Sequence, residues 1–162
     1  MAENENFQKI KHLYNRAGFG LHYSELQKLS HTKLNKLVAD MIEKAKSDVP
    51  ITTIAPDHVK SVMLKNKGLT KKEGLSTEQL KERQKLLVSL NKQLKNLNAE
   101  WVFRMMNTDS PLREKMTLFW NNHFACREEG NPYFAQVLNN IQRKLALGDF
   151  RMLLIEVSKS AS

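Results

Sequence analysis

The chain has 162 residues, a length typical of one domain with a sizeable hydrophobic core. Hydrophobic residues make up 41% and charged residues 27%, with only six glycines and four prolines, a composition that favours helices over strands. No run approaches the roughly 18 apolar residues of a membrane span, and the first six residues are polar and acidic, unlike a secretory signal. We therefore expect one all-α domain over residues 1–162, an irregular multi-helix bundle without an export signal.

The formal net charge of +9 raises the expectation of an anionic partner. Residues 60–100 hold ten Lys or Arg against four acidic residues, so the surplus is concentrated in one part of the chain. No zinc-finger spacing or aromatic RNA-binding strand accompanies it, which disfavours nucleic acid as the partner. A solvated, Lys-rich helix surface is the commoner explanation of such a surplus. Cys126 is the single cysteine, so an internal disulfide is excluded.

Three helices are predicted before the first long connection. Apolar residues recur at helical spacing over 7–17, and Gly18 is a natural stop. A short turn follows, in which two glycines allow positive φ while Phe19 points inward. A short helix is then expected over 23–29, and Ser30 can cap a third one.

The stretch 47–75 interrupts this pattern. It is basic and contains two prolines and two glycines, which favours a connection with one or two helical turns over 57–64. A connection of this length is usually functional or mobile. We expect it to lie inside the single domain rather than to separate two domains.

The longest predicted helix covers about 76–107, and the run Ser-Thr-Glu-Gln at 76–79 forms a capping box at its start. At 1.5 Å per residue it spans roughly 45 Å. Its apolar residues follow a heptad pattern interrupted by Arg83 and Arg104, with a seam of Leu80, Leu87, Leu90, Leu94, Leu97 and Trp101. A basic flank lies away from this seam and consists of Lys81, Lys85, Lys92 and Lys95.

The stretch 112–124 predicts the next helix, opened by Ser110 as N-cap and Pro111 at the first helical position. One face collects its apolar residues and a histidine: Leu112, Met116, Phe119, Trp120, His123 and Phe124. Two interpretations of His123 remain open. The commoner one is a buried ring that is hydrogen-bonded between two helices, and the other is the start of a functional site.

Two further helices complete the chain. Asn131 and Pro132 repeat the cap-then-proline start, Gly148 ends that helix, and Asp149 caps the last one. The last apolar stripe comprises Phe150, Leu153, Leu154, Val157 and Ala161, and it is still periodic when the chain ends. We therefore expect a fragment of a longer helical protein, or a partner protein that covers the last helix.

Three blocks of sequence resemble a known family. They read His-Leu-Tyr-Asn-Arg-Ala-Gly-Phe-Gly at 12–20, Arg-Glu-Lys-Met at 113–116 followed by Phe-Trp-Asn-Asn-His-Phe at 119–124, and Asn-Pro-Tyr-Phe-Ala at 131–135 followed by Ala-Leu-Gly-Asp-Phe-Arg at 146–151. Their order and spacing resemble the N-terminal part of the bacterial family catalogued as domain of unknown function 1800. The resemblance implies a longer protein, and many similar proteins look exported, but it implies no activity.

The chemistry of these blocks suggests a candidate site. We predict His123, Arg16 and Arg143 as its catalytic residues, and the anion or substrate ligands as Asn122, Asn131 and Tyr133. No second His or carboxylate stands three or four residues after His123, so no metal site and no cofactor is assigned.

Two function classes follow from these candidates. The first is the front part of an enzyme-like domain whose site around His123 is completed by residues outside this chain. The alternative is a non-catalytic helical interaction module. It would bind a protein through the heptad seam, or a polyanion through Lys81, Lys85, Lys92 and Lys95.

Overall fold

The protein is described by a computed structural model, which covers residues 2–55, 76–124 and 131–160. These residues form an all-α fold and contain no strand. The helices are α1 (Ala2–Ala17), α2 (Tyr23–Leu29), α3 (Leu34–Lys44), α5 (Thr77–Asn107), α6 (Pro111–His123), α7 (Pro132–Leu145) and α8 (Phe150–Lys159). The all-α prediction with one long helix is therefore confirmed. The turns expected over 57–64 lie outside the described residues.

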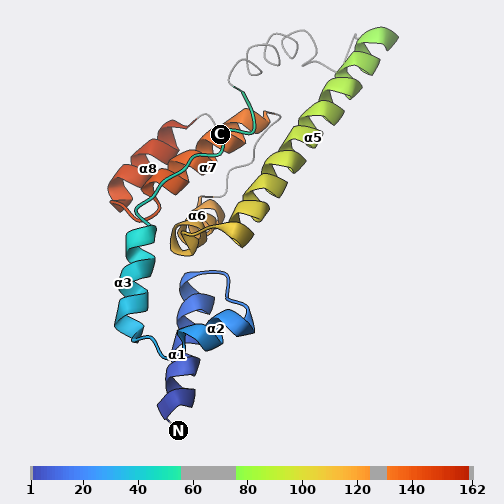
Figure 1. Cartoon of the computed structure of the whole chain (residues 1–162). Helices are drawn as coiled ribbons and strands as arrows, with labels where there is room; N and C mark the ends of the chain where they lie inside the picture. The colour runs from blue at the N-terminus through green and yellow to red at the C-terminus, as the bar shows by residue number, and fades with distance from the viewer. Residues whose placement is uncertain (1, 56–75, 125–130, 161–162) are drawn as a thin grey trace.

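The helices form two groups joined through α6 (Figure 1). In the first group, α1 packs against α2 and α3. In the second group, α5, α6 and α8 each pack against α7, and α5 also packs against α6. Both α1 and α3 also contact α6, which connects the groups. The first half of α5 projects beyond the other helices (Figure 1). α7 is therefore the central element of the larger group.

Short-range signals set most helix starts. Ser76 and Gln79 form the predicted capping box, with Ser76 N donating to Gln79 Oε1 at 2.8 Å and Gln79 N donating to Ser76 Oγ at 3.3 Å. Asn131 and Asp149 likewise accept backbone N–H groups at the starts of α7 and α8. The prediction for Ser30 was wrong, because its hydroxyl donates to Gln27 O at the end of α2. Each of the N-caps at Ser76, Asn131 and Asp149 stabilises its helix by about 1 kcal/mol.

Three apolar clusters make up the buried core. Ile10, Leu26 and Leu37 hold α1, α2 and α3 together. A second cluster joins the segment before residue 56 to α5 and α7, through Ile51, Ile54, Leu97 and Ala135. A third packs α8 against α7, through Leu138, Leu153 and Val157. The heptad seam of α5 is used only in part, because Leu90 and Leu97 are buried while Leu80 and Leu87 are exposed.

α6 buries a face other than the one its apolar spacing predicts. Its buried residues are Arg113, Glu114 and Thr117, whereas Phe119 is 52% exposed. The physical reason is an ion pair with α7, described below, which turns the charged side of α6 inward. The stripe predicted for α8 is likewise only half buried, since Phe150 and Leu154 are exposed.

The turn after α1 brings the two groups of helices together. A Cβ on Gly18 would stand 3.1 Å from Pro111 Cβ, so the absence of a side chain permits this close approach. Gly20 alone among the described residues has positive φ, at 88°. Phe19 does not point into the core as expected, because its ring is exposed and lies 5.1 Å from Lys115 Nζ in a cation–π contact.

Candidate functional site

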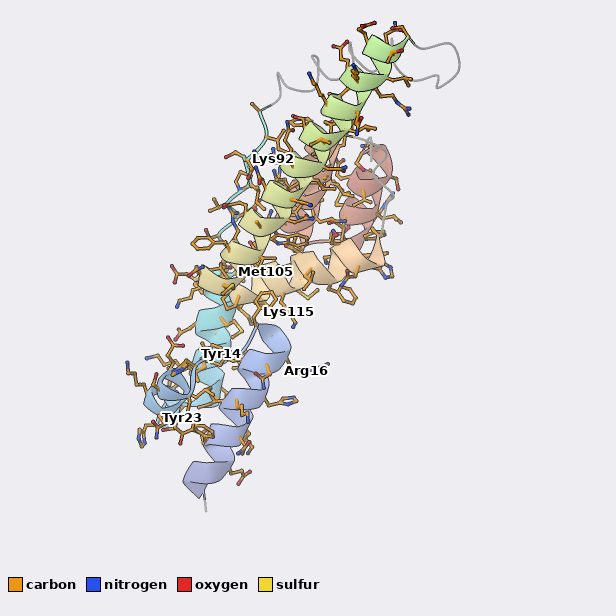
Figure 2. The ribbon with its side chains drawn as sticks, turned by 90° about the vertical axis from the view of Figure 1, so that its right-hand side faces the viewer. Tyr14, Arg16, Tyr23, Lys92, Met105 and Lys115 are labelled. Carbon is orange, nitrogen blue, oxygen red and sulfur yellow. The ribbon has the colours of Figure 1, made fainter. Side chains whose placement is uncertain are left out.

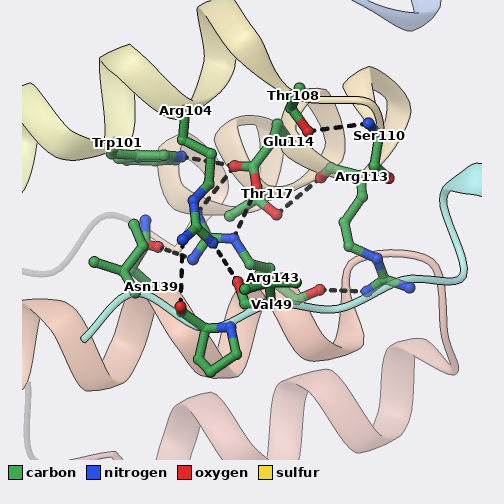
Figure 3. Close-up of polar contacts among 12 residues, drawn as sticks. Val49, Trp101, Arg104, Thr108, Ser110, Arg113, Glu114, Thr117, Asn139 and Arg143 are labelled. Atoms are coloured by element: carbon green, nitrogen blue, oxygen red, sulfur yellow. Dashed lines mark hydrogen bonds and ion pairs between the residues drawn. The ribbon is translucent and has the colours of Figure 1, made fainter.

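A buried ion pair joins α6 and α7 (Figure 3). Arg143 Nε donates to Glu114 Oε1 at 2.9 Å, and Arg143 Nη2 donates to Glu114 Oε2 at 3.0 Å. The two side chains are 1% and 5% exposed. This parallel arrangement is the strongest geometry available to an arginine and a carboxylate.

Residues from neighbouring turns and from α5 complete the pair. Trp101 Nε1 donates to Glu114 Oε2 at 3.0 Å. Asn139 and Asn140 both accept hydrogen bonds from Arg143 Nη1 through their Oδ1 atoms. Every oxygen of the carboxylate therefore has a donor, and three helices meet at one buried charge pair. A group satisfied in this way stabilises the arrangement of α5, α6 and α7.

Arg113 makes a second buried connection (Figure 3). Its Nε donates to Ala45 O at 2.6 Å, and its Nη1 donates to the carbonyl oxygens of Arg143 at 2.6 Å and Lys144 at 3.1 Å. Carbonyl groups at helix ends lack partners within the helix and carry partial negative charge. One guanidinium thus closes the ends of α3 and α7.

Two side-chain amides of α7 form hydrogen bonds with the backbone of residues 51–54, as the backbone of a neighbouring β-strand would. Gln136 Oε1 accepts from Ile54 N at 2.8 Å, and Gln136 Nε2 donates to Ile54 O at 2.9 Å. Asn140 makes the same pair of bonds with Ile51, both at 2.8 Å. Buried backbone groups need such partners. The described end of the 47–75 connection is therefore fixed against α7.

His123 lies on the surface within a group of aromatic rings, so its interpretation as a buried bridge between helices was wrong. Its ring is stacked on Phe119 at 6.1 Å between centroids and meets Trp120 and Phe124 edge to face. Phe150 of α8 joins the same group through Trp120 and Phe124. Trp120 Nε1 also donates to Ala146 O at 2.9 Å, which fixes the orientation of the indole.

The structure separates the three predicted catalytic residues. Arg16 is exposed on α1 and lines a groove of about 460 Å³ between α1 and α3 (Figure 2). Arg143 is buried in its ion pair, and His123 belongs to the aromatic group on α6. No hydrogen bond, ion pair or ring contact among the described residues joins any two of them. A catalytic role shared by the three remains a prediction, and this arrangement does not favour it.

The other predicted ligands have separate surroundings. Asn122 is exposed on α6. Asn131 is buried and caps α7 by accepting from Tyr133 N at 3.1 Å, while its Nδ2 has no partner among the described residues. Tyr133 packs against the Ile51, Ile54, Leu97 and Ala135 cluster. The basic-flank residues Lys81, Lys85, Lys92 and Lys95 are all exposed on α5.

Two further cavities adjoin the buried polar residues. One of about 450 Å³ lies between α3, α5 and the start of α6 and includes Lys44, Arg104 and Asp109. The other, of about 270 Å³, lies between α5, α6 and α7 beside Trp101 and Asn139. Within residues 2–55, 76–124 and 131–160, no three His, Cys, Asp or Glu side chains gather closely enough to hold a metal ion.

Comparison with known proteins gives one match. The family model described as "Protein of unknown function (DUF1800)" matches residues 12–162. The chain belongs to the DUF1800 family. Neither the curated proteins nor the solved structures contain a match. In this DUF1800 protein, none of the described helices is long and apolar enough to cross a membrane.

Sequence reasoning missed the polar residues that organise this DUF1800 domain. Glu114 forms the inter-helix ion pair with Arg143. Trp101 was assigned only to the heptad seam, and Arg113 was given no role. The sequence holds only a weak signal: Thr117 follows Glu114 and Arg113 by three and four residues, which groups these polar residues on one side of α6 but does not identify their partner on α7.

Proposed function

We propose that this chain is a non-catalytic helical interaction module, and that the outer face of α5 binds an acidic, amphipathic helix of a partner protein. The proposal rests on the order in which basic and apolar side chains follow one another along this face of α5. Its first part is mainly basic, with Val88 among the lysines, its last part is apolar, and both parts point away from the core.

The face follows from helix geometry. At about 100° per residue, the four lysines of the basic flank lie on the side of α5 opposite the buried Leu90 and Leu97. The same side continues with Val102, Phe103 and Met106, which are 50%, 63% and 77% exposed. We call these residues together the outer face: Lys81, Lys85, Lys92, Lys95, Val102, Phe103 and Met106. Lys92 lies on the part of α5 that is distant from α1–α3 (Figure 2).

Charge determines the partner's chemistry at the basic end. None of the four lysines forms an ion pair with another described residue, although four other ion pairs occur among those residues. A partner with Glu or Asp along this part gains these interactions and associates faster at low salt. From Lys81 to Met106 the face is about 38 Å long at 1.5 Å per residue, which matches a partner helix of about 25 residues.

The apolar end distinguishes a protein partner from the two alternatives. Nucleic acid would use the lysines and leave Val102, Phe103 and Met106 in water. A membrane-bound helix carries its apolar residues along its whole length with basic residues beside them, whereas here Val88 is the one apolar residue among the lysines and Val102, Phe103 and Met106 gather at the C-terminal end of the face. A partner helix that is acidic at one end and apolar at the other uses the entire outer face.

The polar residues support a non-catalytic assignment. Glu114 and Arg143 satisfy each other and are closed off from solvent, so neither presents a free acid, base or anion ligand. Among the described residues, His123 makes only ring contacts, and no carboxylate of these residues orients it as a general base.

Fluorescence anisotropy with a designed peptide tests the proposal. The probe is a labelled 25-residue amphipathic helix with Glu on one half of its binding face and Leu and Phe on the other half. We expect a Kd on the order of 10 µM, which corresponds to about −7 kcal/mol. Binding should weaken as salt is raised. Replacing Lys81, Lys85, Lys92 and Lys95 together by Glu should weaken binding at least tenfold.

A matched variant controls for net charge. Replacing Lys11, Lys28, Lys33 and Lys36 by Glu, all of them exposed on α1–α3, also lowers the formal charge from +9 to +1. This variant should bind the probe within about twofold of the wild type, because its outer face is intact. Equal losses in the two variants would overturn the proposal. So would tighter binding of a 25-nucleotide DNA or of anionic lipid vesicles than of the peptide.

A further inference from the structure

We propose that the cavity between α5, α6 and α7 binds a neutral, hydroxyl-rich small molecule about the size of one sugar ring. Three carboxamide side chains from three different helices line this cavity: Asn98 of α5, Asn121 of α6 and Asn139 of α7. Trp101, Leu94 and Leu97 form its apolar wall. The site is separate from the outer face of α5.

The carboxamides leave both donors and acceptors available. Asn98 and Asn121 form no side-chain hydrogen bond with another described residue. Asn139 Oδ1 accepts from Arg143 Nη1 at 2.5 Å, which directs its carbonyl group toward the ion pair and leaves Nδ2 as a donor (Figure 3). A carboxamide offers two donors and one acceptor oxygen, and a hydroxyl group can both donate and accept. A ligand with several hydroxyl groups therefore complements this lining.

Among the described residues, the lining contains no charged side chain. The charges of Glu114 and Arg143 neutralise each other, and the cavity residues Trp101 and Asn139 are hydrogen-bonded to this ion pair. An ionised ligand would lose its hydration without gaining a counter-charge. The ligand that fits is therefore neutral.

The apolar wall selects the shape of the ligand. Trp101 is held in place because its Nε1 donates to Glu114 Oε2, so its ring has a fixed orientation beside the cavity. A fixed indole offers a large apolar surface to the C–H groups of a ring. The volume of about 270 Å³ is just below the range of roughly 300–1,000 Å³ for sites of drug-sized ligands. Both features favour a single saturated ring.

NMR titration of the ¹⁵N-labelled chain tests the inference with three neutral hexoses: D-glucose, D-galactose and D-mannose. We expect saturable shifts of the Trp101 indole N–H and the Asn139 side-chain amide for at least one hexose, with a Kd on the order of 1 mM. Cyclohexanol lacks most hydroxyl groups and glucuronate is charged, so both should bind at least tenfold more weakly. Asn121→Leu should weaken hexose binding at least tenfold.

Asn122→Leu is the matched control, because Asn122 is the exposed neighbour of Asn121 and does not line the cavity. It should leave the hexose Kd unchanged within about twofold. If Asn121→Leu does not fold, Asn98→Ala at an exposed position replaces it with the same expected loss. The inference is overturned if no hexose gives a saturable shift, if glucuronate or cyclohexanol binds as tightly, or if Asn122→Leu weakens binding equally.

Discussion

The guanidinium group of Arg143 and the carboxylate of Glu114 face each other with two parallel hydrogen bonds, 29 residues apart in sequence and both closed off from solvent. Trp101 adds α5 to the pair, and Asn139 and Asn140 hold the guanidinium from its own helix. This relationship explains why α6 buries its charged side. Because Arg143 is buried in this ion pair, its guanidinium group is not accessible to an anionic ligand.

Removing one partner of this pair should strongly destabilise the fold. Glu114→Leu leaves the Arg143 charge buried without a counter-ion, and we expect the free energy of unfolding to fall by about 3–5 kcal/mol. Arg143→Met should have a similar effect for the same reason. The double variant should be more stable than either single variant, because apolar side chains then replace both charges. Urea denaturation measures all three.

The exposed Lys46–Glu43 pair provides the comparison. Lys46→Ala should change the free energy of unfolding by less than about 1 kcal/mol, since water already screens that pair. A loss of only this size in Glu114→Leu would contradict the structural role of the buried pair.

The sequence predicted those features that depend on neighbouring residues. The capping box at Ser76 and the cap at Asp149 were predictable because donor and acceptor lie within three residues. The buried face of α6 was not, because the helical spacing of the apolar residues selects the side that carries Phe119 and Trp120. Burial of Glu114 depends on a guanidinium group 29 positions away, which no local pattern contains.

The candidate site was predictable only in part, for the same reason. Asn131 was predicted correctly as a helix cap, while its predicted role as a ligand of an anion or substrate stays a prediction. The cavity between α5, α6 and α7 combines Asn98, Asn121 and Asn139 from three helices. His123 lay within a motif of large rings, and single-sequence spacing could not show that this group of rings reaches the surface. Long-range packing decides both outcomes.

The amide groups of α7 should protect the segment 51–54 from local opening. Gln136→Leu removes both partners of Ile54 and leaves its backbone N–H and C=O unpaired in a buried position. We expect a loss of about 1–3 kcal/mol and faster hydrogen exchange at the Ile54 amide. Lys144→Leu, at an exposed position of the same helix, should alter neither quantity. Unchanged exchange in Gln136→Leu would show that other groups hold the segment.

His123 should contribute little to stability. Its ring is exposed and makes aromatic contacts only, so His123→Ala is expected to lower the free energy of unfolding by less than about 1 kcal/mol. Trp120→Ala, in the same group of rings, should cost at least about 2 kcal/mol more, because the indole packs against the α7–α8 cluster and donates to Ala146 O. Thermal and urea denaturation distinguish these values. A large loss in His123→Ala would restore its interpretation as a structural bridge.

Tyr14 should make the α1–α3 group sensitive to alkaline pH. Burial raises the pKa of its hydroxyl above the usual value of 10.0, and the nearby charges of Asp40 and Glu25 raise it further. The folded state therefore favours the neutral phenol, so this contribution to stability is fully present below pH 10 and is lost as the pH rises through the higher folded-state pKa.

Tyr14→Phe should reduce the alkaline loss in the free energy of unfolding between about pH 9 and 11. Tyr23→Phe, at a 63% exposed position, should retain the loss seen in the wild type. Identical pH profiles for the wild type and Tyr14→Phe would show that other groups cause the alkaline loss.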